Sequence, residues 1–248
     1  MADWDACLAA APIGRISGRL LRLVESQEEV ATNQLVASLE RQAVLEDLLE
    51  STKPPLRKGS ERLHYLLATP FRYPPLRHGS RFGARSEPSL FYGSLGLDTV
   101  LAEAAYYRFV FWQGMAVPPE GKLVTQHTMV EADYLASRGL RLHQPPFAAH
   151  RQTLTDPADY RATQELGTKM RQAGIEAFEF TSARDPHGGT NVALFTPDAL
   201  PTDAPLSMTP WLCELTGGHA KFSAGHDRTV FDFPVGLFMA GGKFPQPA

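Results

Sequence analysis

The sequence predicts a mixed α+β fold with a helical extension at its N-terminus. Beyond residue 56, short strand-like runs alternate irregularly with helical patterns, which favours α+β or mixed α/β over a regular doubly wound sheet. Before that point, many helix formers follow Pro12, and Lys53-Pro54-Pro55 ends the region because proline cannot continue a helix. We therefore divide the chain into a helical extension, residues 1–55, and a main domain, residues 56–248.

The extension is predicted to form amphipathic helices. Leucines recur in it at near-helical spacing beside charged residues, and they are Leu35, Leu39, Leu45, Leu48 and Leu49. Such helices either pack on the main domain as a cap or offer a surface for self-association or a partner. The pattern leaves both alternatives open, and with them the oligomeric state.

The main domain is predicted to contain two helices among short strands. The strands are expected at residues 89–92, 122–130, 175–180, 190–195 and 229–233. One helix is expected at residues 100–111, where Asp98 or Thr99 can cap it by accepting from exposed amides. The other is expected at residues 157–173, with a proline in its first turn and Gly174 past its end.

Length, charge and cysteine content limit the classes of protein to which the chain can belong. A chain of 248 residues can bury a sizeable core, and its formal net charge of -3 provides no overall basic field for nucleic acid. Cys7 and Cys213 lie far apart, which fits free thiols in a reducing cytosol better than a disulfide framework. The acidic N-terminus is unlike a signal peptide, and no run approaches the roughly 18 apolar residues of a membrane span. We expect a cytoplasmic protein.

Common catalytic and nucleotide-binding motifs are absent from the sequence. It contains no G-x-G-x-x-G after a strand, no G-x-x-x-x-G-K and no G-x-S-x-G. The eight histidines form no H-E-x-x-H, and there is no C-x-x-C, so no metal site is expected. These absences argue against Rossmann, P-loop, serine hydrolase and zinc enzyme classes.

Three residues spaced eleven positions apart form the most informative feature of the chain. Arg81 lies in a Gly-rich turn, Tyr92 ends a short apolar run, and Glu103 lies within the predicted helix 100–111. A cation, a phenol and a carboxylate can together hold an anionic, ring-bearing substrate and stabilise developing positive charge.

Each of the three also has a structural alternative. Glu103 has apolar neighbours, and burying an ionised carboxylate is costly unless it is paired, so it either serves a site or pairs with Arg108 on the helix surface. Arg81 belongs to a local cluster with Arg72, Arg77 and Arg85, which binds phosphate or is a solvated surface. Tyr92 contacts a ligand or packs in the core.

A second cluster lies downstream in the segment FEFTSARDPHGGTNVALF. Ser182 stands where a strand enters a turn, and Arg184, Asp185 and His187 follow it. Its hydroxyl either reaches into a cleft formed by loops or stabilises the local turn.

These residues resemble the RES domain family, which is named for its Arg, Glu and Ser. The resemblance rests on Gly79-Ser80-Arg81-Phe82, the run ending at Tyr92, Ala102-Glu103, Ser182-x-Arg184 and the segment GTNVALF at 189–195. It covers roughly residues 70–200. The family often has G-G-R-W-N where this chain has Ser80, Phe82 and Gly83.

The resemblance implies a fold related to ADP-ribosyltransferases, with a central split β-sheet flanked by helices. It also implies a bacterial, cytoplasmic toxin of a toxin–antitoxin pair that cleaves the nicotinamide–ribose bond of NAD by phosphorolysis or hydrolysis. NAD would be the substrate, inorganic phosphate a co-substrate, and a helix-turn-helix antitoxin the partner, with no metal, membrane or direct nucleic-acid contact. The alternatives are a protein ADP-ribosyltransferase and a non-catalytic nucleotide- or protein-binding module of the same fold.

Under this resemblance the site residues acquire roles. Arg81 binds the diphosphate or an incoming phosphate, Tyr92 stacks on nicotinamide or hydrogen-bonds the ribose, and Glu103 faces the developing cation. Ser182 fixes the nicotinamide ribose or amide. Further substrate contacts are expected from Arg72, Arg85 and Asn191.

Overall fold

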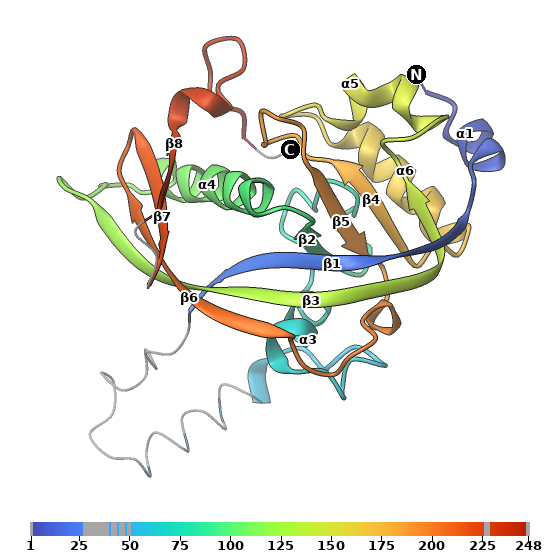
Figure 1. The fold of residues 1–248 in the computed structure, drawn as a ribbon, viewed down its shortest axis with the longest axis horizontal. Coiled ribbons are helices and arrows are strands. Elements are labelled where there is room, and N and C mark those ends of the chain that lie inside the picture. The colour runs from blue at the N-terminus through green and yellow to red at the C-terminus, as the bar shows by residue number, and fades with distance from the viewer. Residues whose placement is uncertain are drawn as a thin grey trace.

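An eight-stranded sheet organises the described part of the chain (Figure 1). The computed structural model describes residues 2–26, 40, 44, 48, 51–225 and 229–246. The strands are β1 (Gly14–Glu25), β2 (Phe91–Ser94), β3 (Leu123–Arg141), β4 (Ala177–Thr181), β5 (Thr190–Leu194), β6 (Ser207–Leu215), β7 (His219–Ala224) and β8 (Val230–Pro234). The helices are α1 (Trp4–Ala10), α3 (Tyr65–Arg72), α4 (Leu97–Gln113), α5 (Arg151–Leu154) and α6 (Arg161–Gln172), with 3-10 turns η2 (Phe147–His150), η3 (Pro197–Ala199) and η4 (Val235–Phe238).

The strand order is β1-β2-β5-β4-β3-β6-β7-β8, and β1 pairs with β3 as well as with β2. Strands β1, β2, β5, β4 and β3 therefore form a closed ring of pairings, from which β6, β7 and β8 extend on the other side of β3. The β3–β4 pair is parallel and the other pairs are antiparallel. This arrangement confirms the predicted mixed α/β class.

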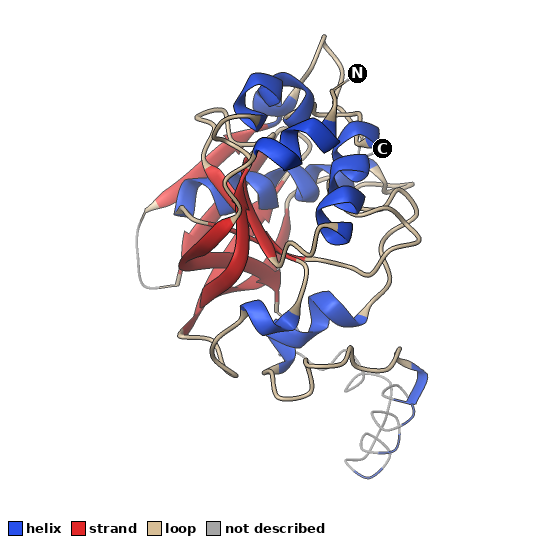
Figure 2. Ribbon diagram, turned by 90° about the vertical axis from the view of Figure 1, so that its right-hand side faces the viewer, coloured by secondary structure: helices blue, strands red, loops and turns tan. Residues whose placement is uncertain are grey.

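Helix α4 lies across the sheet and packs against β1, β2 and β7 (Figure 1). Its buried side chains include Leu101, Tyr106 and Phe109, which join Cys213 and Phe222 from β6 and β7 in one hydrophobic cluster. Most helices lie on one side of the sheet, with α3 apart from them (Figure 2). These buried contacts fix the orientation of α4 about its own axis, next to β2 and β5.

The predicted elements of the main domain correspond to β2, α4, β3, α6, β4, β5 and β8. The predicted cap of α4 is wrong, because Gly96 is the N-cap and no side chain caps the helix. Thr99 instead donates its hydroxyl proton to Asp185 Oδ2 at 2.8 Å, which ties the start of α4 to the turn before β5. Helix α3 and strands β6 and β7 were not predicted.

The helical prediction for residues 1–55 is wrong for Gly14–Glu25, which form β1 and pair with β3 along most of their length. The boundary predicted at residue 55 therefore does not separate β1 from the sheet of the main domain. Of the five leucines predicted to form an amphipathic stripe, only Leu48 is described, as an exposed helical residue. The other four lie outside the described residues.

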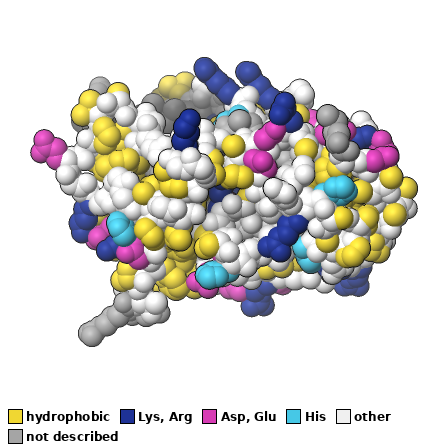
Figure 3. Space-filling view, turned by 90° about the horizontal axis from the view of Figure 1, so that it is seen from above, with side chains coloured by type: hydrophobic (Ala, Val, Ile, Leu, Met, Phe, Trp, Pro, Cys, Tyr) yellow, Lys and Arg dark blue, Asp and Glu magenta, His cyan; other side chains and the backbone are white. Residues whose placement is uncertain are grey.

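Three further expectations concern membrane-spanning helices, disulfides and surface charge. Within the described residues, no helix is both long and apolar enough to cross a bilayer. Cys7 and Cys213 are both free and buried. On the face seen from above, Lys and Arg side chains are interspersed with Asp and Glu side chains rather than gathered into one basic field (Figure 3).

Candidate active site

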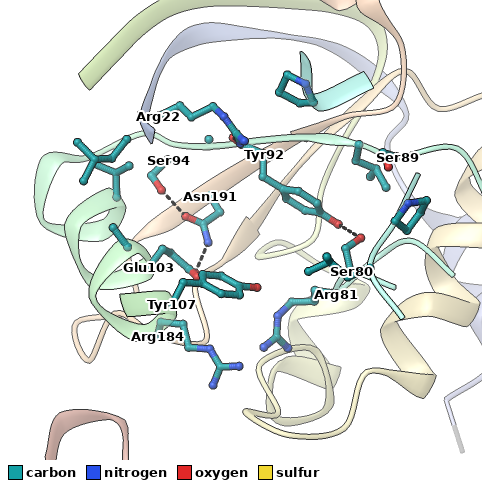
Figure 4. Close-up of a pocket in the computed structure, with 18 of the residues that line it drawn as sticks. Arg22, Ser80, Arg81, Ser89, Tyr92, Ser94, Glu103, Tyr107, Arg184 and Asn191 are labelled. Carbon is teal, nitrogen blue, oxygen red and sulfur yellow. Dashed lines mark hydrogen bonds between the residues drawn. The ribbon is translucent and has the colours of Figure 1, made fainter. Parts of the chain in front are cut away.

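A cavity of about 600 Å³ opens between α4, β1, β2 and the loop that carries Arg81. A volume of this size is typical of small-molecule sites. Ten of its polar and aromatic neighbours are labelled in Figure 4, including Arg22, Arg81, Glu103, Arg184 and Asn191. The side chains come from segments that are far apart in sequence, so the cavity exists only in the folded chain.

The carboxylate of Glu103 is held by one of its two oxygens (Figure 4). Its Oε1 accepts from Ser182 Oγ at 2.6 Å and from Asn191 Nδ2 at 2.6 Å. Oε2 has no donor among the described residues, and Glu103 lines the cavity. One oxygen is thus anchored by neutral donors while the other remains available to a ligand.

The alternative pairing of Glu103 with Arg108 does not occur in the structure. Arg108 Nη1 donates instead to Glu25 Oε2 at 3.0 Å. Glu103 has no ion-pair partner among the described residues.

Ser182 is buried and lies behind Glu103 rather than in the cavity wall. Its Oγ donates to Glu103 and accepts from the backbone amides of Arg184 at 3.1 Å and Asp185 at 3.0 Å. Of the two sequence-based alternatives, the structure shows the turn-stabilising one. The hydroxyl does not reach into the cavity and instead orients the carboxylate of Glu103. Asn191 is placed in the same way, since its Oδ1 accepts from Ser94 Oγ at 2.7 Å.

Tyr92 lines the cavity, and its hydroxyl holds the loop that carries Arg81, called the arginine loop below. The phenol oxygen accepts from the amide of Phe82 at 3.2 Å and shares a 2.9 Å hydrogen bond with Ser80 Oγ. Burial raises the pKa of Tyr92 to about 12, and the bonds to Ser80 and Phe82 oppose that rise only in part. Tyr92 is therefore a neutral phenol at physiological pH.

The loop needs glycine at position 79. Gly79 has a φ of +72°, and a Cβ there would lie 2.4 Å from the carbonyl oxygen of Gly83. This tight turn, fixed by Tyr92, determines where Arg81 enters the cavity.

The guanidinium of Arg81 is anchored on one edge. Its Nη1 donates to the carbonyl oxygens of Leu154 at 3.3 Å and Asp156 at 2.8 Å, and its Cζ lies 4.6 Å from the ring centroid of Tyr160. Nη2 is buried without a hydrogen-bond partner among the described residues. A buried donor in this state is costly unless a ligand satisfies it.

The structure brings Arg81, Tyr92, Glu103 and Asn191 to the cavity wall, with Ser182 directly behind. It does not bring Arg72 or Arg85 there. Arg72 Nε donates to the carbonyl oxygen of Pro54 at 2.5 Å, and Arg85 is exposed.

Sequence reasoning missed Arg22 and gave no cavity role to Arg184. Arg22 lies on β1, in a segment predicted to be helical, and its Nη1 donates to the carbonyl oxygen of Tyr92 at 2.7 Å. Burial lowers the pKa of Arg22 to about 10, so it remains a cation at neutral pH. The sequence carries no clear signal for this strand, because the apolar residues of RISGRLLRLV do not alternate strictly with polar ones.

The cavity has a positive balance within an acidic chain. Four arginines and two glutamates line it, a formal surplus of two positive charges, whereas the whole chain carries -3. His127 also lines it, and burial together with nearby Arg108 lowers its pKa to about 4, so this imidazole is neutral at physiological pH. The arrangement suits an anionic ligand that offers a positive centre to Glu103.

Comparisons with known proteins test the family resemblance. The model of the RES domain matches residues 55–215. No curated protein matches the chain. Among solved structures, the crystal structure of the M. tuberculosis MbcT-MbcA toxin-antitoxin complex is similar, with 10% identity, a TM-score of 0.47, and coverage of 86% of this chain and 92% of that chain. Since the family model spans more than half of the sequence, the chain belongs to the RES domain family.

Proposed function

We propose that this protein is an NAD-consuming enzyme that cleaves the bond between nicotinamide and ribose. The observation that carries the proposal is the carboxylate of Glu103, fixed through Oε1 by Ser182 and Asn191 and open at Oε2 toward a cavity with surplus positive charge. A dinucleotide with a diphosphate and a cationic pyridinium ring matches both the arginines and the carboxylate.

The chemistry needs little more than a fixed negative charge. As the C–N bond to nicotinamide breaks, its electron pair returns to the ring nitrogen and positive charge develops at the anomeric carbon, as in glycoside hydrolysis. A preorganised carboxylate stabilises that charge without reorganising during the reaction. Nicotinamide leaves as a neutral molecule, so no general acid is required.

The nucleophile completes the bond at the anomeric carbon. In phosphorolysis, an oxygen of inorganic phosphate attacks and gives ADP-ribose-1''-phosphate. In hydrolysis, water attacks and loses a proton to the solution. The arginines that line the cavity together with Glu103 favour a phosphate nucleophile, because their planar donors match phosphate oxygens.

The other residues take supporting roles in this proposal. Arg81 binds phosphate oxygens through its unpartnered Nη2, and Tyr92 holds the loop of Arg81 while its ring lines the cavity beside the nicotinamide ribose. Ser182 positions Glu103 rather than contacting the substrate, since it lies behind the carboxylate.

We extend the proposal to the biological context. An enzyme that depletes NAD is harmful to its own cell unless it is restrained, and the family resemblance implies a toxin paired with a helix-turn-helix antitoxin. The partner would cover the cavity, whose rim carries exposed apolar side chains such as Tyr73 and Leu76. Co-purification with the product of an adjacent small reading frame tests this part.

Nicotinamide release tests the enzymatic proposal. The purified chain is incubated with NAD, with and without inorganic phosphate, and free nicotinamide is followed over time. Release only with phosphate identifies phosphorolysis, and release in both conditions identifies hydrolysis. A folded protein that releases none in either condition contradicts the proposal and leaves a binding module as the function.

A further inference from the structure

A second arginine, Arg184, lines the cavity, and part of its guanidinium has no acceptor among the described residues. It is only 5% exposed, and its Cζ lies 3.5 Å from the ring centroid of Tyr106. Its Nη2 donates to the carbonyl oxygen of Pro157 at 2.8 Å and to Tyr160 Oη at 2.9 Å. Within the described residues, neither Nε nor Nη1 of Arg184 has an acceptor.

Tyr160 joins Arg184 to Arg81. The ring of this buried tyrosine faces the Arg81 guanidinium at 4.6 Å, and its hydroxyl accepts from Arg184. The two guanidiniums extend to the same side of the site in Figure 4. Tyr160 thus fixes both cations at one end of the cavity, beyond Glu103.

Neither guanidinium is neutralised by the protein. No Asp or Glu of the described residues forms an ion pair with Arg81 or Arg184, although many other arginines of the chain are paired. Buried charges are normally paired because desolvation is costly. The stacking of Arg184 on Tyr106 offsets part of that cost, but it leaves the free N–H edges without acceptors.

We infer that Arg184, Arg81 and Tyr160 form a binding subsite for a phosphate group. Guanidinium edges present paired N–H donors that match two oxygens of a tetrahedral oxyanion. The hydroxyl proton of Tyr160 has no acceptor among the described residues and supplies one more donor. The identity of the ligand rests on the proposed function: it is either free inorganic phosphate or the diphosphate of the dinucleotide.

Arg184 also links this subsite to Glu103. Its backbone amide donates to Ser182 Oγ, which itself donates to Glu103 Oε1. The turn that orients the carboxylate therefore also sets the backbone from which the guanidinium extends. A phosphate bound there is held at a fixed position relative to the reacting centre.

Equilibrium binding without turnover tests the subsite. Calorimetry on the full chain uses two probes separately, inorganic phosphate and ADP-ribose. Arg184→Gln is expected to weaken binding of at least one probe by about tenfold or more, because it removes charge-assisted hydrogen bonds. Arg85→Gln is the matched control, since Arg85 is exposed outside the cavity, and it is expected to bind as the wild type does.

The probe that binds more weakly to the Arg184 variant identifies the source of the phosphate group. Weaker binding of inorganic phosphate assigns the subsite to the free anion, and weaker binding of ADP-ribose alone assigns it to the diphosphate. Should Arg184→Gln fail to fold, Tyr160→Phe removes only the hydroxyl and is expected to weaken binding about threefold.

Two results overturn the subsite: a wild-type chain that binds neither probe, or folded variants at both positions that bind both probes as the wild type does. The proposed function fails separately. If the chain binds phosphate through Arg184 but releases no nicotinamide from NAD, the subsite is supported and the enzymatic proposal is contradicted.

Discussion

The hydroxyl of Ser182 donates to Oε1 of Glu103 at 2.6 Å, joining a turn after β4 to the middle of α4 across 79 positions of sequence. The same hydroxyl accepts two backbone amides of its own turn, so its proton is directed toward the carboxylate. Glu103 therefore cannot rotate freely, and its second oxygen is presented to the cavity.

Glu103→Gln is expected to lower the rate of nicotinamide release by at least about 100-fold, because it removes the negative charge that faces the developing cation. The amide oxygen of glutamine can still accept from Ser182 and Asn191, so the fold is expected to be retained. Glu131→Gln is the matched control, since Glu131 lies on β3 outside the cavity. Equal rates for the two variants would exclude an electrostatic role for Glu103.

Ser182→Ala is expected to reduce the rate less than Glu103→Gln does, by about 10- to 100-fold, because one of two donors to the carboxylate is lost while its charge remains. Ser207→Ala removes a comparable Ser-to-Glu hydrogen bond of 2.9 Å on β6, away from the cavity, and is expected to leave the rate unchanged. Single-turnover rates of both variants distinguish positioning from general stability. A Ser182 variant as slow as Glu103→Gln would instead indicate direct contact with substrate.

Acid is expected to destabilise the protein through His127. The pKa of this buried imidazole is lowered to about 4, against about 6.5 in the unfolded chain, so the unfolded state binds the proton more readily. The stabilisation is complete above pH 6.5 and is lost as pH falls toward 4. The free energy of unfolding should fall by at most about 1.4 kcal/mol per pH unit from this residue in that range.

Denaturant unfolding of the wild type and His127→Asn between pH 4 and 7 measures this slope. The variant should lose the part of the pH dependence that His127 contributes. Identical pH profiles would show that His127 is not the titrating group.

Gly167→Ala is expected to disturb the arginine loop through packing. A Cβ at this position of α6 would lie 1.9 Å from the carbonyl oxygen of Phe82, next to Arg81, so the helix and the loop must separate. Overpacking of this kind costs about 1 to 3 kcal/mol of stability, and the shift of Arg81 should also lower the nicotinamide release rate. Gly121→Ala, where a Cβ meets nothing within 4 Å, is the matched control for thermal unfolding and rate. Unchanged stability at position 167 would contradict the close packing of α6 on the loop.

The part of the fold that the sequence predicted correctly depends on local patterns. Strands β4 and β5 are short apolar runs on either side of the turn-rich segment SARDPHGG, and α6 ends just before Gly174; each was expected close to its observed position. Strand β1 was not, because its leucines and arginines also fit a helix. Pairing with β3, more than 100 residues later, selects the extended form.

The candidate site divides in the same way. The residue types and their order already indicated an acid, a cation and a phenol, and those side chains do meet at one cavity. The sequence could not predict that the Tyr92 hydroxyl forms hydrogen bonds with Ser80 and Phe82, or that Ser182 acts through Glu103. Hydrogen-bond partners are set by distances between segments, which no spacing along the chain encodes.

By itself the sequence determined the family, the mixed α/β class and the identity of the residues suited to chemistry at a cationic centre. Only the tertiary structure decided which arginines serve the cavity: it brings Arg22 and Arg184 to its wall and leaves Arg72 and Arg85 outside. The physical reason is that a side chain's type fixes what it can bind, whereas the packing of distant strands and helices fixes what it faces. Because of the same packing, Arg81, Tyr92 and Glu103, which are spaced eleven positions apart in the sequence, line one cavity.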